Sequence, residues 1–247
     1  MLERIERLPK LILFDYGETL VHEERLDSTK YYEKMFEFAI ENPDNITAND
    51  LAKELQEINE ELGRFDPQRK GLYNQEITEE ALLNYLLQKN RICLSKTYDE
   101  IANLLWNAGS KASPMEGVEE LLASLRKLGI RTAVVSNISY SGESLYKRLK
   151  KIIPSHEFEF IIASSDIGFR KPGRRIFELA LKKGNVQHDE VWYCGDQYTC
   201  DIEGAIQAGI QPIWYHTIDK NMSIGDNIIC LEHWNELQKL LEMKEDI

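Results

Sequence analysis

The sequence predicts an α/β protein in which a doubly wound parallel sheet carries an inserted α-helical domain after its first strand. Three observations support this fold class. Residues 11–14 form an apolar run that stops at Asp15 and a glycine turn, which is typical of a buried parallel strand. From residue 113 onward, short apolar runs alternate with amphipathic segments, as in repeated βα units. Between residues 22 and 112, helical periodicity prevails and strand signals are few.

Amphipathic helices are expected throughout the inserted segment. They cover residues 28–41, 50–62, 79–89 and 98–108, the last beginning at a capping box of Thr97 and Glu100. Roughly ninety residues are too many for a loop in a compact domain. The predicted domains are therefore a helical cap, 22–112, and a core, 1–21 with 113–247. The irregular stretch 63–74 either faces a substrate or forms a solvated turn, and its charged residues are Arg64, Asp66, Arg69 and Lys70.

The second half of the core is expected to begin with a helix over residues 113–128. Ser113 and Glu116 form a capping box with Pro114 at the first helical position, and Gly129 follows the end. Strands are predicted at residues 130–135, 158–163, 191–194, 211–215 and 227–231. Further helices are predicted at residues 143–152, 173–183 and 233–242, with another ending at Gly209.

The charge balance is acidic, since 30 basic and 42 acidic side chains give a net charge of −12. This balance argues against nucleic acid and anionic membranes as partners. Residues 1–10 are charged and lack the apolar core of a signal peptide, and no run reaches membrane-spanning length. We therefore expect a cytoplasmic protein. The sequence does not determine its oligomeric state. The cysteines lack zinc-site spacing and are expected to be reduced thiols; they are Cys93, Cys194, Cys200 and Cys230.

Polar side chains gather at four predicted strand ends. They are Asp15 and Thr19 after the first strand, Ser136 and Asn137 after the next, Lys171 at a helix start, and Asp196 and Asp201 after a later strand. Parallel strands of a doubly wound sheet end at one edge, and ligands bind at that edge. We therefore expect these seven residues to lie close together.

The same residues stand in four motifs that together resemble the haloacid dehalogenase (HAD) superfamily over nearly the whole chain. The motifs are Asp15-Tyr-Gly-Glu-Thr19, Ser136, Lys171 within Gly168-Phe-Arg-Lys-Pro172, and Gly195-Asp-Gln-Tyr-Thr-Cys-Asp201. One motif alone is weak evidence, but four in order at strand ends are specific. The resemblance implies a Rossmann-like core, a helical cap, and a hydrolase that acts on a small phosphorylated metabolite.

The resemblance also implies a role for each residue. Asp15 would attack phosphorus and form an aspartyl-phosphate. Lys171 would offset carboxylate charge and hold the transferring group. Ser136 Oγ and the Asn137 backbone N–H would donate hydrogen bonds to phosphoryl oxygens, while Thr19 would steady the turn. The implied cofactor is Mg²⁺, with Asp15, the Gly17 carbonyl, Asp196 and Asp201 as its site, Asp201 acting by orienting bound water or a neighbour.

Gly17 departs from the family pattern. Family phosphatases usually carry a carboxylate there as general acid and base, a function worth about 10²–10⁴-fold in rate. Glu18 is the nearest substitute, although successive turn residues point in different directions. The alternatives are a dehalogenase-like or phosphonatase-like reaction, or a phosphate-binding protein with weak turnover. Retention of Asp196 and Asp201 argues against a Mg²⁺-independent dehalogenase, and retention of the whole constellation favours a Mg²⁺-dependent phosphohydrolase.

Overall fold

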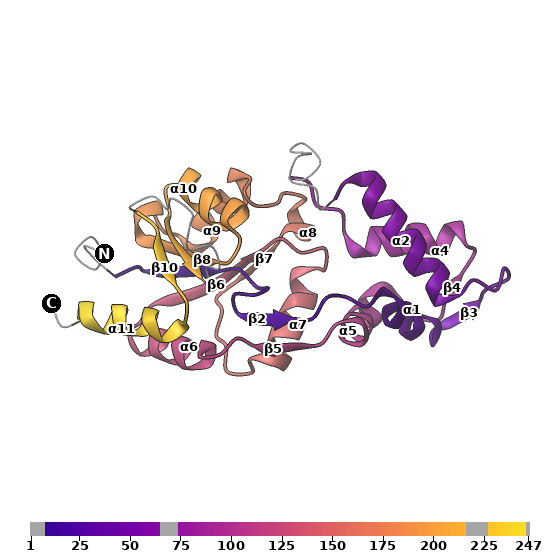
Figure 1. Cartoon of the computed structure of the whole chain (residues 1–247), viewed down its shortest axis with the longest axis horizontal. Coiled ribbons are helices and arrows are strands. Elements are labelled where there is room, and N and C mark those ends of the chain that lie inside the picture. Colours follow the sequence, from indigo (N-terminus) through magenta and orange to yellow (C-terminus); the bar gives the residue numbers. More distant parts are fainter. Residues whose placement is uncertain (1–7, 65–73, 216–226, 246–247) are drawn as a thin grey trace.

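A six-stranded parallel sheet forms the centre of the computed structural model, which describes residues 8–64, 74–215 and 227–245 (Figure 1). Its strand order is β10-β9-β8-β1-β6-β7, and every neighbouring pair is parallel. The strands are β1 (Leu11–Phe14), β6 (Arg131–Ser136), β7 (Ile161–Ala163), β8 (Val191–Gly195), β9 (Gln211–Tyr215) and β10 (Ile229–Leu231). The predicted doubly wound, Rossmann-like fold is thus confirmed.

Helices cover both faces of the sheet. One face carries α6 (Val118–Lys127), α7 (Gly142–Ile152) and α11 (Trp234–Glu245), and the other carries α9 (Arg174–Gly184) and α10 (Glu203–Gln207). Successive side chains of a strand point to opposite faces. Ile12 and Phe14 of β1 therefore pack with the first set, and Leu11 and Leu13 with the second, all four fully buried. This double burial explains why β1 is a continuous apolar run.

The inserted residues form a mainly helical body beside the sheet (Figure 1). Its elements are α1 (Ser28–Phe36), α2 (Ala48–Leu62), α4 (Glu79–Lys89), α5 (Tyr98–Gly109) and the antiparallel pair β3 (Ala39–Glu41) and β4 (Cys93–Leu94). The capping box of Thr97 and Glu100 is confirmed at the start of α5. The helix predicted over residues 28–41 is wrong at its end, because the chain leaves the helix after Phe36 and pairs as β3. Strand pairing with a segment fifty residues away has overridden the local helical pattern.

A short antiparallel ribbon joins the sheet to the helical body. It consists of β2 (Val21–Glu23) and β5 (Ala112–Pro114), with His22 opposite Ser113. The predicted helix start at Ser113 is therefore wrong, although the helix itself forms as α6. The residue preceding α6 is Gly117, which has a φ of 80°. Pairing between segments distant in the sequence has again overridden a local signal, here a capping box.

Other boundaries shift by a few residues. β7 covers Ile161–Ala163 of the predicted 158–163 strand, and the helix ending before Gly209 begins as a π-helix, η3 (Tyr198–Ile202). All four cysteines lie in the described ranges and are free thiols. Among the described helices, none combines the length and apolar character that a membrane span requires. Of the predicted charged loop, Arg64 is buried, whereas Asp66, Arg69 and Lys70 lie outside the described residues.

Candidate active site

Asp15 follows the last residue of β1, at the edge where the parallel strands end. β1 lies between β8 and β6, so its direction is fixed on both sides. The Asp15 N–H donates to the Cys194 carbonyl oxygen over 2.9 Å, which continues the pairing with β8 by one residue. Only 7% of Asp15 is exposed. The fold therefore holds this carboxylate in one place at the edge where the parallel strands end.

Lys171 is the cation at the centre of the site. Its Nζ donates to Asp15 Oδ1 over 2.7 Å, to Asp201 Oδ1 over 2.6 Å and to Tyr193 Oη over 2.6 Å. Burial by itself lowers the pKa of Lys171, but the carboxylates of Asp15 and Asp201 outweigh burial and raise this pKa above the ordinary lysine value. Lys171 therefore stays charged and offsets part of the buried negative charge.

Tyr193 completes the surroundings of Lys171, and the sequence reasoning missed it. The residue lies in β8 and is fully buried. Its hydroxyl oxygen lies 3.0 Å from the Val135 carbonyl oxygen and 3.1 Å from Asp201 Oδ1. Burial, and then the nearby carboxylate of Asp201, raises the pKa of Tyr193, so the hydroxyl stays protonated. A buried tyrosine inside an apolar strand needs a hydrogen-bond partner, and that need is the signal that could have identified it.

Asp201 is held by hydrogen bonds to both of its oxygens. Oδ1 accepts from Lys171, and Oδ2 accepts from the Gln197 N–H over 3.0 Å. The carboxylate packs directly against Gly195, where any Cβ would collide with it. Glycine is therefore required at position 195 by close approach, which explains the glycine of the fourth motif.

Three carboxylates converge beside Lys171. Asp15, Asp196 and Asp201 each offer an oxygen, and these oxygens lie within 4.8 Å of one another. Burial, together with the charges of Asp15 and Asp201, raises the pKa of Asp196 to about 7. The set is thus electrostatically crowded and rich in hard oxygen donors, which fits a divalent cation that prefers oxygen ligands. Thr19 is buried at this cluster, with its Oγ1 3.5 Å from Asp196 Oδ1.

Ser136 ends β6, and Asn137, which follows it, contacts the backbone of Lys171. Ser136 is the last residue of the strand and is 3% exposed. The Asn137 side chain clamps the backbone of Lys171: Oδ1 accepts from the Lys171 N–H over 2.7 Å, and Nδ2 donates to its carbonyl oxygen over 2.9 Å. The resemblance assigned Asn137 a backbone donor only. Its side chain has the additional effect of fixing the loop that carries Lys171.

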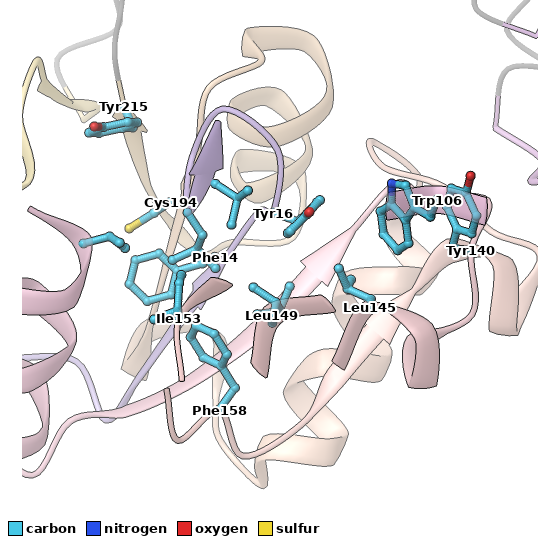
Figure 2. Packing of buried hydrophobic residues seen from close by; sticks show 14 of the residues in the cluster. Phe14, Tyr16, Trp106, Tyr140, Leu145, Leu149, Ile153, Phe158, Cys194 and Tyr215 are labelled. Carbon is cyan, nitrogen blue, oxygen red and sulfur yellow. The ribbon is translucent and has the colours of Figure 1, made fainter. Parts of the chain in front are cut away.

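A cavity of about 270 Å³ opens beside Asn137, where the helical body meets the sheet. Its lining includes Trp106, Tyr140 and Arg170. Trp106 stacks on Tyr140 with 3.9 Å between ring centroids, and Figure 2 shows this pair at the end of a row of buried side chains that passes Tyr16. A ligand in this cavity would contact both parts of the molecule.

The model of the haloacid dehalogenase-like hydrolase family matches residues 12–215. The chain belongs to this family. Glyceraldehyde 3-phosphate phosphatase of Pyrococcus abyssi is 26% identical over 212 residues, which cover 83% of this chain and 81% of that protein. Haloacid dehalogenase-like hydrolase domain-containing protein 3 of Mus musculus is 34% identical over 100 residues, covering 39% and 37% of the two chains.

Solved structures of HAD proteins share the fold. The 2-haloacid dehalogenase of Pseudomonas syringae pv. Tomato DC3000 superimposes with a TM-score of 0.61 at 20% identity, covering 96% of this chain and 99% of that one. The HAD phosphatase of Thermococcus onnurineus gives a TM-score of 0.57 at 20% identity, covering 94% and 97%. At this identity the likeness establishes the fold alone.

The HAD motif in this chain differs from the phosphatase pattern at Gly17, where a Cβ would have no described heavy atom within 4 Å. The neighbouring Glu18 takes a left-handed φ of 52°. Its carboxylate accepts from the Glu23 N–H over 3.1 Å and lies 3.0 Å from His22 Nδ1. These contacts engage both carboxylate oxygens of Glu18 with residues of the β2 strand. Glu18 stays the nearest candidate for the missing acid, as expected from the sequence.

Proposed function

We propose that the protein is a Mg²⁺-dependent phosphohydrolase that acts on a small phosphorylated molecule through an aspartyl-phosphate on Asp15. The observation that carries the proposal is the buried contact of Lys171 with Asp15 and Asp201, beside the third carboxylate, Asp196. A nucleophilic carboxylate needs compensating positive charge when it approaches an anionic phosphate. Relatives named glyceraldehyde 3-phosphate phosphatase and phosphoserine phosphatase support the phosphorylated substrate class.

In this proposal Asp15, Asp196 and the Gly17 carbonyl hold Mg²⁺, and Asp201 orients the surroundings. When bound, Mg²⁺ neutralises carboxylate and phosphate charge and thereby lowers the repulsion between nucleophile and substrate. The role of Asp201 is supported by its hydrogen bonds, because Lys171 and the Gln197 N–H already engage both of its oxygens.

The reaction takes place in two displacements at phosphorus. In the first, a carboxylate oxygen of Asp15 forms a bond to phosphorus while the bond to the leaving-group oxygen breaks. Lys171 Nζ, Ser136 Oγ and the Asn137 N–H offset the charge on the phosphoryl oxygens. In the second, water attacks phosphorus, the bond to the Asp15 oxygen breaks, and inorganic phosphate leaves with the carboxylate restored.

Gly17 narrows the range of good substrates in this proposal. A side-chain acid at that position would protonate the leaving oxygen, and glycine has none. Substrates whose leaving group is stable as an anion, such as aryl or acyl phosphates, depend least on that proton.

The proposal also includes residues 22–112 as a cap over the site. It includes a cytoplasmic location as well, and the free thiols support that location. Nucleic acid is not a proposed partner, since the net charge is −12.

Hydrolysis of an activated aryl phosphate tests the proposal. We expect the wild-type protein to release phosphate when Mg²⁺ is present, and we expect this release to stop when EDTA is added. Asp15→Asn should abolish release, because the amide is a far weaker nucleophile. Glu54→Gln is the matched control, since Glu54 pairs with Lys89 inside the helical body and should leave the rate unchanged.

Two outcomes would contradict the proposal. Tight binding of inorganic phosphate without turnover at any Mg²⁺ concentration would indicate a binding protein. Release of chloride from a 2-haloacid without Mg²⁺ would indicate a dehalogenase.

Mg²⁺ binding is checked separately by thermal unfolding. Free Mg²⁺ at a hundredfold excess over its dissociation constant should add about 2.7 kcal/mol to the free energy of unfolding. This gain should be reduced in Asp196→Asn.

A further inference from the structure

Residues 74–79, which lead into α4 of the helical body, lie across two loops of the sheet edge. The Glu76 N–H donates to the Gly168 carbonyl oxygen over 3.1 Å. The Glu79 N–H donates to the Ser139 carbonyl oxygen over 3.0 Å. One of these loops begins with Asn137, directly after Ser136 at the end of β6, and the other leads to Lys171. The segment thus contacts both loops that surround the proposed phosphate position.

The Glu76 carboxylate is the polar centre of this contact, and its side chain is only 1% exposed. Oε1 accepts from Arg64 Nη2 over 3.1 Å. Oε2 accepts from Ser164 Oγ over 2.6 Å and lies 3.4 Å from Arg170 Nη1. A buried carboxylate is costly unless charge and hydrogen bonds compensate it. Here one compensating cation comes from the end of α2 and the other from the sheet edge.

Two partners of Glu76 connect directly to the proposed catalytic loops. Ser164 Oγ accepts from the Ile138 N–H over 2.8 Å, and Ile138 follows Asn137. Arg170 immediately precedes Lys171 in the chain. The Glu76 carboxylate is therefore linked to the β6 loop by two hydrogen bonds through Ser164. Its other partner, Arg170, is the residue before the lysine that contacts Asp15.

We propose that Glu76 is a positioning residue for phosphoryl transfer. Its carboxylate holds the β6 loop, through Ser164, and the Lys171 loop, through Arg170, in fixed positions relative to each other. The inference rests on the proposed function and adds a residue to it from the helical body. Its physical basis is that groups aimed at a transition state lose effect when their supporting contacts loosen by a fraction of an ångström.

Glu76→Gln tests this inference, because the amide keeps the shape and loses the charge. We expect kcat for the aryl phosphate to fall about 10–100-fold, the usual cost of losing a supporting contact. The dissociation constant for inorganic phosphate, measured by calorimetry, should rise about tenfold by the same reasoning. Glu54→Gln is the control, since it removes a carboxylate of the helical body that contacts Lys89 and Asn90 and neither loop.

Ser164→Ala provides a second route that keeps the Glu76 charge and its arginine contacts. It removes only the hydroxyl between Glu76 and Ile138, and it should lower kcat and phosphate affinity in the same direction. If both residues act through one connection, the double variant should lose little more than Glu76→Gln alone. Where Glu76→Gln is too unstable to assay, the Ser164→Ala single variant remains decisive, and a wild-type kcat and phosphate affinity in it would overturn the connection through Ser164.

A wild-type kcat and a wild-type phosphate dissociation constant in Glu76→Gln would overturn the inference, whatever the change in thermal stability. Additive losses in the double variant would overturn the connection through Ser164. Absence of both turnover and phosphate binding in the wild-type protein would instead reject the proposed function, and the inference with it. Failure of the two ideas is therefore distinguishable.

Discussion

At the scale of one residue, Gly17 lacks the carboxylate that family phosphatases usually carry, and the backbone conformation does not require glycine there. Within the described part of the chain, a Cβ at Gly17 would meet no heavy atom within 4 Å, and its φ lies outside the left-handed region. The left-handed conformation in this turn belongs instead to Glu18, at φ 52°. Neither packing nor strain therefore requires glycine at position 17, and the fold has room for a carboxylate side chain there.

Restoring that carboxylate should broaden the substrate range. We expect Gly17→Asp to fold normally and to raise the rate on an alkyl phosphate by about 10²–10⁴-fold, the usual worth of general acid–base catalysis. The rate on an aryl phosphate should change much less, because its leaving group needs no proton. Phosphate release from the two substrates measures the difference. Gly17→Asn is the control of matched size, and equal rates for the two variants would show that no acid was missing.

At the scale of elements, Arg148 of α7 links two segments: the turn after β1, which contains Tyr16, and the β2–β5 ribbon that leads to the helical body. Its Nε donates to Tyr16 Oη over 3.0 Å, and its Nη2 donates to Glu23 Oε1 over 2.7 Å and to the Ser110 carbonyl oxygen over 3.0 Å. Its guanidinium also lies over the ring of Trp106, 4.4 Å from the centroid. Figure 2 shows Trp106 and Tyr16 in the same row of side chains. The side chain of Arg148 is 1% exposed, so this cation is fully dependent on its partners.

Removing that cation should be costly. Arg148→Met leaves Glu23 without its buried partner, and we expect the free energy of unfolding to fall by about 3–5 kcal/mol. Urea unfolding followed by circular dichroism measures this loss. Arg174→Met is the matched control: it breaks an exposed pair with Glu178, whose side chains are 74% and 49% exposed. That pair is worth about 1 kcal/mol at most, and comparable losses in the two variants would refute the role given to Arg148.

For the whole molecule, His156 makes the free energy of unfolding depend on pH. The residue is 1% exposed, stacks on Phe158, and accepts through Nδ1 from the Phe158 N–H. Burial, and then the charge of Lys150, lowers the pKa of His156 to about 4. Between about pH 6.5 and pH 4, His156 binds a proton in the unfolded chain but stays neutral in the folded molecule. Stability is therefore lost as the pH falls from about 6.5 toward 4.

His156→Asn should remove this contribution while keeping an acceptor near Nδ1. We expect the loss of stability between pH 7 and 4.5 to be about 1–3 kcal/mol smaller in the variant than in the wild-type protein. Urea unfolding at several pH values measures the slope. His22→Asn is the control: Glu18 raises the pKa of this exposed histidine, so its effect should be small and opposite in sign. An unchanged slope in His156→Asn would exclude His156 as the source.

Much of the fold was predictable because it is encoded locally. The apolar run of β1, the periodicity of α4 and the capping box of α5 each lie within a dozen consecutive residues, and all three were placed correctly. The errors occurred where distant segments pair. The ribbon of β2 with β5 and the pair of β3 with β4 join residues far apart in the chain, and the local signals at Ser113 and in residues 37–41 gave no warning of them.

By itself, the sequence determined the order of strand ends and the residue types at each of them, since these features depend on short patterns: Asp15, Ser136, Lys171, Asp196 and Asp201. Only the tertiary structure decided what surrounds them. Lys171 meets Tyr193, and Asn137 clamps the Lys171 backbone. Glu76 of the helical body contacts Ser164 and Arg170, which connect it to the two loops. Such contacts join segments tens of residues apart, and no periodicity or spacing along the chain specifies which side chains meet when those segments pack.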